Sequence, residues 1–220
     1  MSVNELPGMN AAKYGPGDRL IAMHAAHNAF RRDLERLAGV ATAANLRDPN
    51  RRASIMSGWT IFKHQLHIHH SHEDRFLWPR LRDRLAGSES ATSVLEDMQA
   101  EHDLIDPLLE AVDSSFLDPH HVDVAEVIDE LITKLAFHLG HEERDAIPLI
   151  GEAISNEEWS RVVKDIRKAT KLSSAAEFMP WLTDGVDREQ SKTIASIMPP
   201  PARVVLNRVW KPKYDRVSHW

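Results

Sequence analysis

The chain of 220 residues contains no cysteine. Disulfides, thiolate nucleophiles, cysteine-based zinc sites and cysteine-ligated iron–sulfur clusters are therefore excluded. No apolar run approaches the roughly 20 residues needed to cross a bilayer, and the N-terminal MSVNELPGMN lacks the basic and then apolar pattern of a secretory signal. We expect a cytoplasmic protein with no membrane span, in which any metal is bound by nitrogen and oxygen.

The chain is also poor in glycine (9), while 42% of its residues are hydrophobic and 27% are charged. This composition is typical of a globular protein with one sizeable core and a small appendage. The net charge of −6 argues against nucleic-acid binding. Residues 1–150 carry 15 basic and 24 acidic side chains, whereas residues 151–220 carry 12 and 9, so the C-terminal part is mildly basic. The composition leaves the oligomeric state open.

Apolar residues recur at helical spacing in four segments, at about 18–40, 51–86, 95–112 and 124–142. Breaks at the sequences DPN (48–50) and GSES (87–90) separate them, and no alternating strand pattern of comparable strength is present. The spacing predicts an all-α protein, an up-down-up-down four-helix bundle over residues 18–150. We expect residues 151–220 to form a short helical C-terminal extension that packs on the bundle.

Six polar residues interrupt these apolar lines. They are His27, His69, Glu73, His102, His138 and Glu142. A gap-free internal repeat accounts for four of them, since HHSHEDRFLWP (69–79) aligns on HLGHEERDAIP (138–148) in the shared pattern H-x-x-H-E-[DE]-R-x-x-x-P. Each copy follows a helix with one inward histidine. The chain thus reads as two related helical hairpins, each with one lone histidine and one His-x-x-x-Glu pair.

Helical geometry predicts that these six side chains meet at one level inside the bundle. Burial of two carboxylates and four imidazoles among apolar residues would cost several kcal/mol per unpaired charge, and a cation removes that cost. Six ligands are too many for one tetrahedral zinc but suit two metals with a bridging carboxylate, and donors without thiolate favour iron, with manganese as the alternative.

The remaining histidines divide by their angular position. His64 and His67 turn outward, and His70 lies on one flank of the inward stripe. His72 and His141 lie at its edge, so that both contact with a ligand and direct ligation stay open for them. His24, one turn before His27, is a weaker contender for the first-helix ligand.

These residues resemble the hemerythrin family, including the long-form bacterial hemerythrin-like or HHE cation-binding domains. The resemblance rests on His27 in HNAFRRDL, His69-x-x-x-Glu73, His102 in EHDLIDPLL and His138-x-x-x-Glu142, and it covers about residues 18–150. It implies a non-haem site with two iron ions bridged by an oxo or hydroxo group and by Glu73 and Glu142.

The chain departs from the oxygen-carrying members of the family at two positions. Those proteins have a fifth histidine one turn after the third-helix histidine, where this chain has Asp106, and their fourth-helix carboxylate corresponds to Glu143 rather than Glu142. Asp106 is thus either an extra ligand or only the residue before Pro107.

Two functional hypotheses follow from the six residues and the resemblance. In the first, the protein binds a small oxygen or nitrogen species, such as O2, peroxide or NO. In the second, it is a redox enzyme of the peroxide-disproportionating (catalase-like) or NO-consuming type. A structural bundle with adventitious metal is the third reading. We expect Trp59, Phe62, Phe76 and Trp78 to surround the site.

Overall fold

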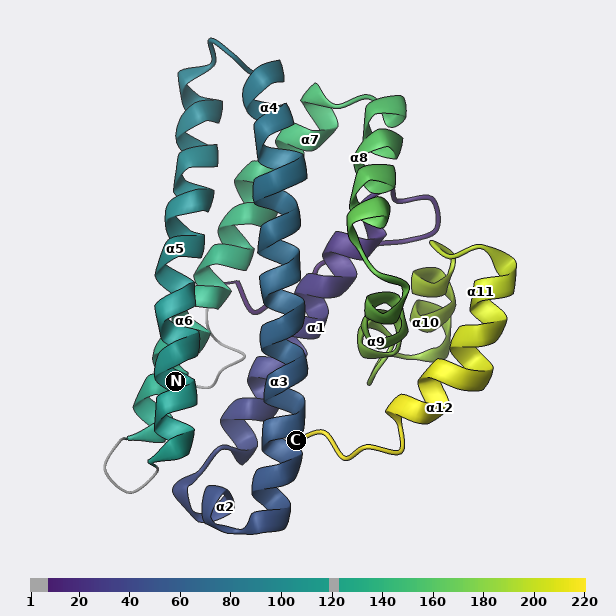
Figure 1. Cartoon of the computed structure of the whole chain (residues 1–220). Helices are drawn as coiled ribbons and strands as arrows, with labels where there is room; N and C mark the ends of the chain where they lie inside the picture. The colour runs from purple at the N-terminus through teal and green to yellow at the C-terminus, as the bar shows by residue number, and fades with distance from the viewer. Residues whose placement is uncertain (1–7, 119–122) are drawn as a thin grey trace.

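The computed structural model describes residues 8–118 and 123–220. Four long helical segments lie side by side with alternating direction (Figure 1), and the described residues contain no strand. The segments are α1 (Ile21–Val40), α3 (Pro49–His72) continued by α4 (Trp78–Arg84), α5 (Glu89–Leu117), and α6 (Val124–His141) continued by α7 (Ile147–Ala153). The short α2 (Ala43–Arg47) connects α1 to α3. The predicted all-α, up-down-up-down four-helix bundle is confirmed.

Side-chain caps begin three of the four segments. Asp48 accepts hydrogen bonds from the backbone N–H groups of Asn50 and Arg51 at the start of α3, where Pro49 occupies the first turn. Ser88 caps α5 and Asp123 caps α6 in the same manner. The breaks read from the sequence at 48–50 and 87–90 therefore coincide with helix starts.

Both long repeat-bearing segments contain a π-helical turn, which the sequence pattern does not predict. The turns are η2 (Glu73–Leu77) and η3 (Glu142–Ala146), and the N–H groups of Trp78 and Ile147 donate to the carbonyls of Glu73 and Glu142. Pro79 and Pro148 follow directly, and a proline has no N–H to continue the regular α-helical ladder. The same distortion therefore begins at the repeated glutamate in both copies.

The bundle interior consists of two apolar clusters. The larger contains Phe30, Phe62 and Leu66, and the smaller contains Trp78, Leu95 and Met98. On each long segment, the polar residues that interrupt the inward apolar line lie between residues of the larger cluster and residues of the smaller one. The core is therefore interrupted at one level along the bundle.

The chain after α7 forms short helices beside α1 and α3 (Figure 1). They are α8 (Asn156–Ala169), α9 (Leu172–Leu182), α10 (Arg188–Ala195), α11 (Pro200–Val205), η4 (Leu206–Trp210) and α12 (Lys211–Tyr214). The side chain of Ser155 caps α8 in a capping box with Glu158.

A buried polar contact joins this C-terminal segment to the bundle. Trp181 of α9 is fully buried, its indole N–H donates to Asp33 Oδ2 of α1 at 2.7 Å, and its ring lies 5.0 Å from that of Phe30. Arg32 Nε donates to the other oxygen of Asp33 at 2.8 Å. We propose on this basis that residues 151–220 are an extension that folds together with the bundle of residues 18–150.

Among the residues the structure describes, no helix is both long enough and apolar enough to span a membrane.

Candidate metal centre

Seven side chains form two adjacent groups of possible metal ligands at the polar level of the bundle. One group contains His27, His69, Glu73 and Glu142, and the other contains His70, His102 and His138. Within each group the ligand atoms lie within 4.8 Å of one another. The structure thus brings together all six residues singled out in the sequence, and adds His70.

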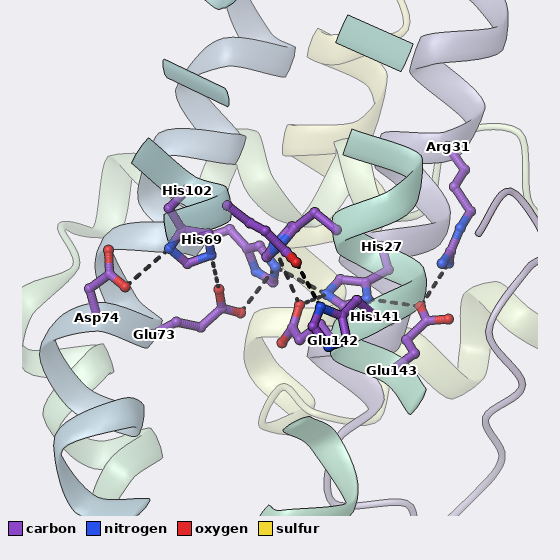
Figure 2. A network of polar contacts seen from close by, with 11 residues as sticks. His27, Arg31, His69, Glu73, Asp74, His102, His141, Glu142 and Glu143 are labelled. Atoms are coloured by element: carbon purple, nitrogen blue, oxygen red, sulfur yellow. Dashed lines mark hydrogen bonds and ion pairs between the residues drawn. The ribbon is translucent and has the colours of Figure 1, made fainter. Parts of the chain in front are cut away.

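Each long segment contributes to this centre (Figure 2). His27 comes from α1, His69 and His70 from α3, His102 from α5 and His138 from α6. The two glutamates are the first residues of the π turns η2 and η3. Because each glutamate follows its histidine by one helical turn, the His-x-x-x-Glu spacing points both side chains to the same side of the helix.

The two glutamates belong to the first group and also face histidines of the second. Glu73 Oε1 is 3.1 Å from His69 Nε2 in the first group, while Glu73 Oε2 is 3.6 Å from His102 Nε2 in the second. Glu142 Oε2 is 3.1 Å from His27 Nε2 and 3.9 Å from His138 Nε2. Each carboxylate therefore contacts histidines of both groups, which is the placement required for bridging two cations.

The atoms that converge there fit a metal better than they fit each other. Seven of them are buried without a hydrogen-bond partner among the described residues: both carboxylate oxygens of Glu73 and of Glu142, and the Nε2 atoms of His70, His102 and His138. An unsatisfied buried polar atom costs about 1–3 kcal/mol. His27 Nε2 and His69 Nε2 also face each other at 3.1 Å. A cation between these two rings would be bound by both nitrogens.

His70 joins the centre although the sequence does not predict it, because its position on the flank of the inward stripe of α3 does not by itself indicate a ligand. Its ring is buried and stacks on that of His102, with centroids 3.9 Å apart and planes 11° from parallel. The flank of α3 faces α5 at this level, so a residue 100° away from His69 still points to the second group. The doublet His69-His70 was the available signal.

Burial and neighbouring charges shift the pKa values of the side chains in the centre in different directions. Burial lowers the pKa values of His69 and His70 well below the usual imidazole value, and it also lowers that of His138 despite the nearby Glu101. Burial, together with the nearby Glu142, raises the pKa of Glu73 well above its usual range. Burial would also raise the pKa of Glu142, but His27, His69 and His138 keep it below its usual range.

His27 behaves differently from the other histidines. Burial alone would lower its pKa, but the carboxylates of Glu142 and Glu143 raise it to about 9. Without a metal, His27 is therefore a cation at neutral pH, whereas His69, His70 and His138 are neutral and ready to bind. A cation that enters the centre must displace the proton of His27.

Zinc affinity is accordingly expected to rise with pH up to about 9, where His27 loses its proton. Below that pKa the metal that binds His27 releases about one proton from it, so the apparent affinity of that ion rises roughly tenfold per pH unit. The proton of Glu73 steepens this dependence wherever that carboxyl is still protonated. Chelator competition with zinc between pH 6.5 and 8.5 measures the slope, and a pH-independent affinity would contradict the assignment of His27 as a ligand.

The other candidates from the sequence lie outside both groups. His24 Nδ1 pairs with Asp18 at 3.0 Å, and Asp106 is exposed on α5. His72 lies 3.5 Å from the hydroxyl of Thr170, so it faces the extension rather than the centre. His64 and His67 are exposed, as expected.

Glu143 contacts the candidate ligand His27, and His141 shares the carboxylate of Glu101 with the candidate ligand His138, but neither belongs to the two groups. Glu101 accepts hydrogen bonds from Nδ1 of His138 at 2.9 Å and from Nδ1 of His141 at 2.6 Å. Glu101 therefore lies between His141 and the centre. Glu143 accepts from Nδ1 of His27 at 2.8 Å, so its carboxylate lies on the outer side of that ring (Figure 2). The inward carboxylate of the fourth helix is thus Glu142.

The four aromatic residues expected around the centre lie at different places in the bundle. Trp59, Phe62 and Trp78 are fully buried in the two apolar clusters, and Phe76 is partly exposed. The aromatic ring in contact with a histidine of the centre is that of Phe30, at 5.3 Å from His69.

Comparison with known proteins agrees with this geometry. The sequence profile of the hemerythrin HHE cation binding domain matches residues 19–150, which include all seven side chains. The zinc finger protein BRUTUS of Arabidopsis thaliana is 23% identical over 141 residues, which are 63% of this chain but only 11% of that protein. No solved structure matches the chain. Because the profile covers more than half of the chain, the protein belongs to the hemerythrin HHE cation-binding family.

Proposed function

We propose that this protein binds two iron ions in the bundle core and uses them to bind a small oxygen or nitrogen species such as O2, peroxide or NO. The observation that carries the proposal is the set of seven donors, five imidazoles and two carboxylates, of which all but His69 are buried. They form two adjacent groups, and the two glutamates of the first group also face histidines of the second. His27, His69, Glu73 and Glu142 would bind one ion. His70, His102 and His138 would bind the other, with the same glutamates as bridges.

The donor types favour iron over other common metals. Imidazole and carboxylate without thiolate suit iron or manganese, whereas structural zinc takes four ligands in a closed tetrahedron. With shared carboxylates, the first group supplies four protein donors and the second supplies five. Both numbers are below the six of an octahedral ion, so positions remain for an exogenous ligand. Manganese stays the alternative.

Burial limits what that ligand can be. His27, His138 and Glu142 are fully buried, and the most exposed side chain of the set is that of His69, at 12%. We expect a species of a few atoms to approach beside His69, the least buried of the seven side chains. The apolar clusters above and below exclude water from the centre.

The residues of the chain would act on the bound species by position and charge. The metal pair would supply the redox chemistry. The carboxylates of Glu73 and Glu142 would balance the cationic charge in the low-dielectric interior, and the imidazoles would orient the open positions.

A redox enzyme that disproportionates peroxide or consumes NO is the second candidate. It uses the same seven donors, and it is supported by the carboxylate of Glu73, which faces histidines of both groups and would hold two metals close enough to act on one substrate. Turnover, rather than structure, distinguishes it from the binding protein.

Iron analysis and the visible spectrum of the purified, iron-loaded protein test the proposal. We expect two irons per chain and absorption bands that change when NO or peroxide is added. Oxygen evolution after the addition of hydrogen peroxide would favour the enzyme over the binding protein. A chain that stays without stoichiometric metal after loading would overturn both and support a purely structural polar core.

A further inference from the structure

The repeat contains an acidic residue that the proposed ligand set leaves unused. In both copies of H-x-x-H-E-[DE]-R the glutamate of the centre is followed directly by a second acid, Asp74 in the first hairpin and Glu143 in the second. Neither belongs to the two ligand groups. Both stand inside the π turns, at their second residue.

Each of these two acids contacts a histidine of the other hairpin. Glu143, on the second hairpin, accepts a hydrogen bond from Nδ1 of His27 on the first hairpin at 2.8 Å. Asp74, on the first hairpin, accepts from Nδ1 of His102 on the second hairpin at 3.1 Å. In Figure 2 the two acids lie at opposite ends of the network, each on the outer side of its histidine.

The local geometry explains why each acid pairs with the histidine of the opposite hairpin. Successive residues of a helix point about 100° apart, so the residue after an inward glutamate points along the flank toward the neighbouring helix. For Glu143 that neighbour is α1, and for Asp74 it is α5. Glu143 is further fixed by Arg31, whose Nη1 donates to the same oxygen at 2.8 Å while its Nε donates to the carbonyl of Gly8 at 2.6 Å.

We propose that Asp74 and Glu143 are positioning residues, each of which orients the lone histidine of the opposite hairpin for metal binding. This inference rests on the proposed metal centre. A carboxylate that accepts from Nδ1–H fixes the ring orientation and leaves Nε2 free to bind a cation. His27 Nε2 and His102 Nε2 are the atoms that face the two bridging glutamates.

These contacts between hairpins link the two halves of the centre. Asp74 directly follows Glu73, which belongs to the four-donor group, yet its partner His102 belongs to the three-histidine group. Neither hairpin therefore contains all that is needed to orient its own lone histidine. Glu101, by contrast, lies on the same hairpin as His138, and the corresponding position in the first hairpin is Ala26.

Nuclear magnetic resonance of the metal-free protein tests the contacts without any metal. In the wild type we expect the Nδ1–H protons of His27 and His102 to be slowed in their exchange with solvent. Asp74→Ala should remove the protected signal of His102 and leave that of His27, and Glu143→Ala should do the reverse. Asp103→Ala is the matched control, because Asp103 is an exposed neighbour of His102 on α5 that contacts Gln99 instead of a ligand.

Zinc affinity by chelator competition tests the consequence for metal binding. Asp74→Ala is expected to weaken binding about 10–100-fold, whereas Asp74→Asn, which keeps an acceptor oxygen, should restore most of the loss. In a His102→Ala background the same change at Asp74 should have almost no further effect, because its partner is already absent. Asp74 is partly exposed, with 30% of its side chain accessible, so we expect the Asp74→Ala chain to fold.

Two results would overturn the inference. One is a protected His102 signal that persists in Asp74→Ala, and the other is an effect of Asp74→Ala that adds fully to that of His102→Ala. Because the magnetic-resonance experiment needs no metal, it decides the positioning contacts even if iron loading of the wild type fails. Failure of the proposed function and failure of this inference are thus distinguishable.

Discussion

Replacement of His70 by alanine is expected to lower bound iron from two ions to about one per chain. His70 supplies one of the three histidines of the second group, and its ring is buried against those of His102 and His138. With two imidazoles and the shared carboxylates left, this ion loses a donor in a site that water enters poorly. Metal analysis of the purified, iron-loaded variant measures the loss.

His67→Ala is the control for this experiment. His67 lies on the same helix as His70, but its side chain is exposed. Its removal should therefore leave the iron content at two ions per chain. His102→Ala and Glu73→Ala should reduce the iron content to one ion or none. His102 is one of the three histidines of the second group, and Glu73 contacts histidines of both groups. Equal loading of His70→Ala and His67→Ala would show that His70 is only a buried polar neighbour.

Trp181→Ala is expected to destabilise the protein by about 3–5 kcal/mol. The change removes a fully buried indole from between α9 and α1, and it deprives the buried carboxylate of Asp33 of one of its donors. For a chain of this size, the melting temperature should fall by roughly 6–20 °C. Chemical denaturation followed by circular dichroism gives the free energy of unfolding.

Two further variants separate the contributions in this contact. Trp181→Phe keeps a ring against Phe30 but loses the hydrogen bond to Asp33, so it should cost less, about 1–3 kcal/mol. Val209→Ala, an exposed position of the extension, should change stability by less than about 0.5 kcal/mol. If Trp181→Ala were as mild as Val209→Ala, the extension would not be part of one folding unit with the bundle.

The same contact bears on the centre. Phe30 packs on Trp181 at 5.0 Å on one side and on His69 at 5.3 Å on the other. The C-terminal segment therefore supports the aromatic ring that lies beside the least buried ligand, although its sequence carries no ligand motif.

The sequence by itself determined the fold class and the level of the polar centre. Helical period, caps and breaks are local properties, so the four long helices could be read directly from them. The six polar interruptions fall on the inward lines because helical spacing places a residue on a face whatever its neighbours are. The internal repeat then required that the two hairpins present equivalent side chains.

Only the tertiary structure decided which flank residues join the centre. His70 and His72 lie on opposite sides of the inward line of α3, and the sequence cannot say which side faces a partner helix at that depth. Packing places His70 against α5 and His72 against the extension. The same applies to Asp74 and Glu143, whose partners lie on the other hairpin, and to Asp33 and Trp181, which are 148 residues apart. These contacts depend on how helices pack against each other, and a periodic pattern within one helix does not encode that arrangement.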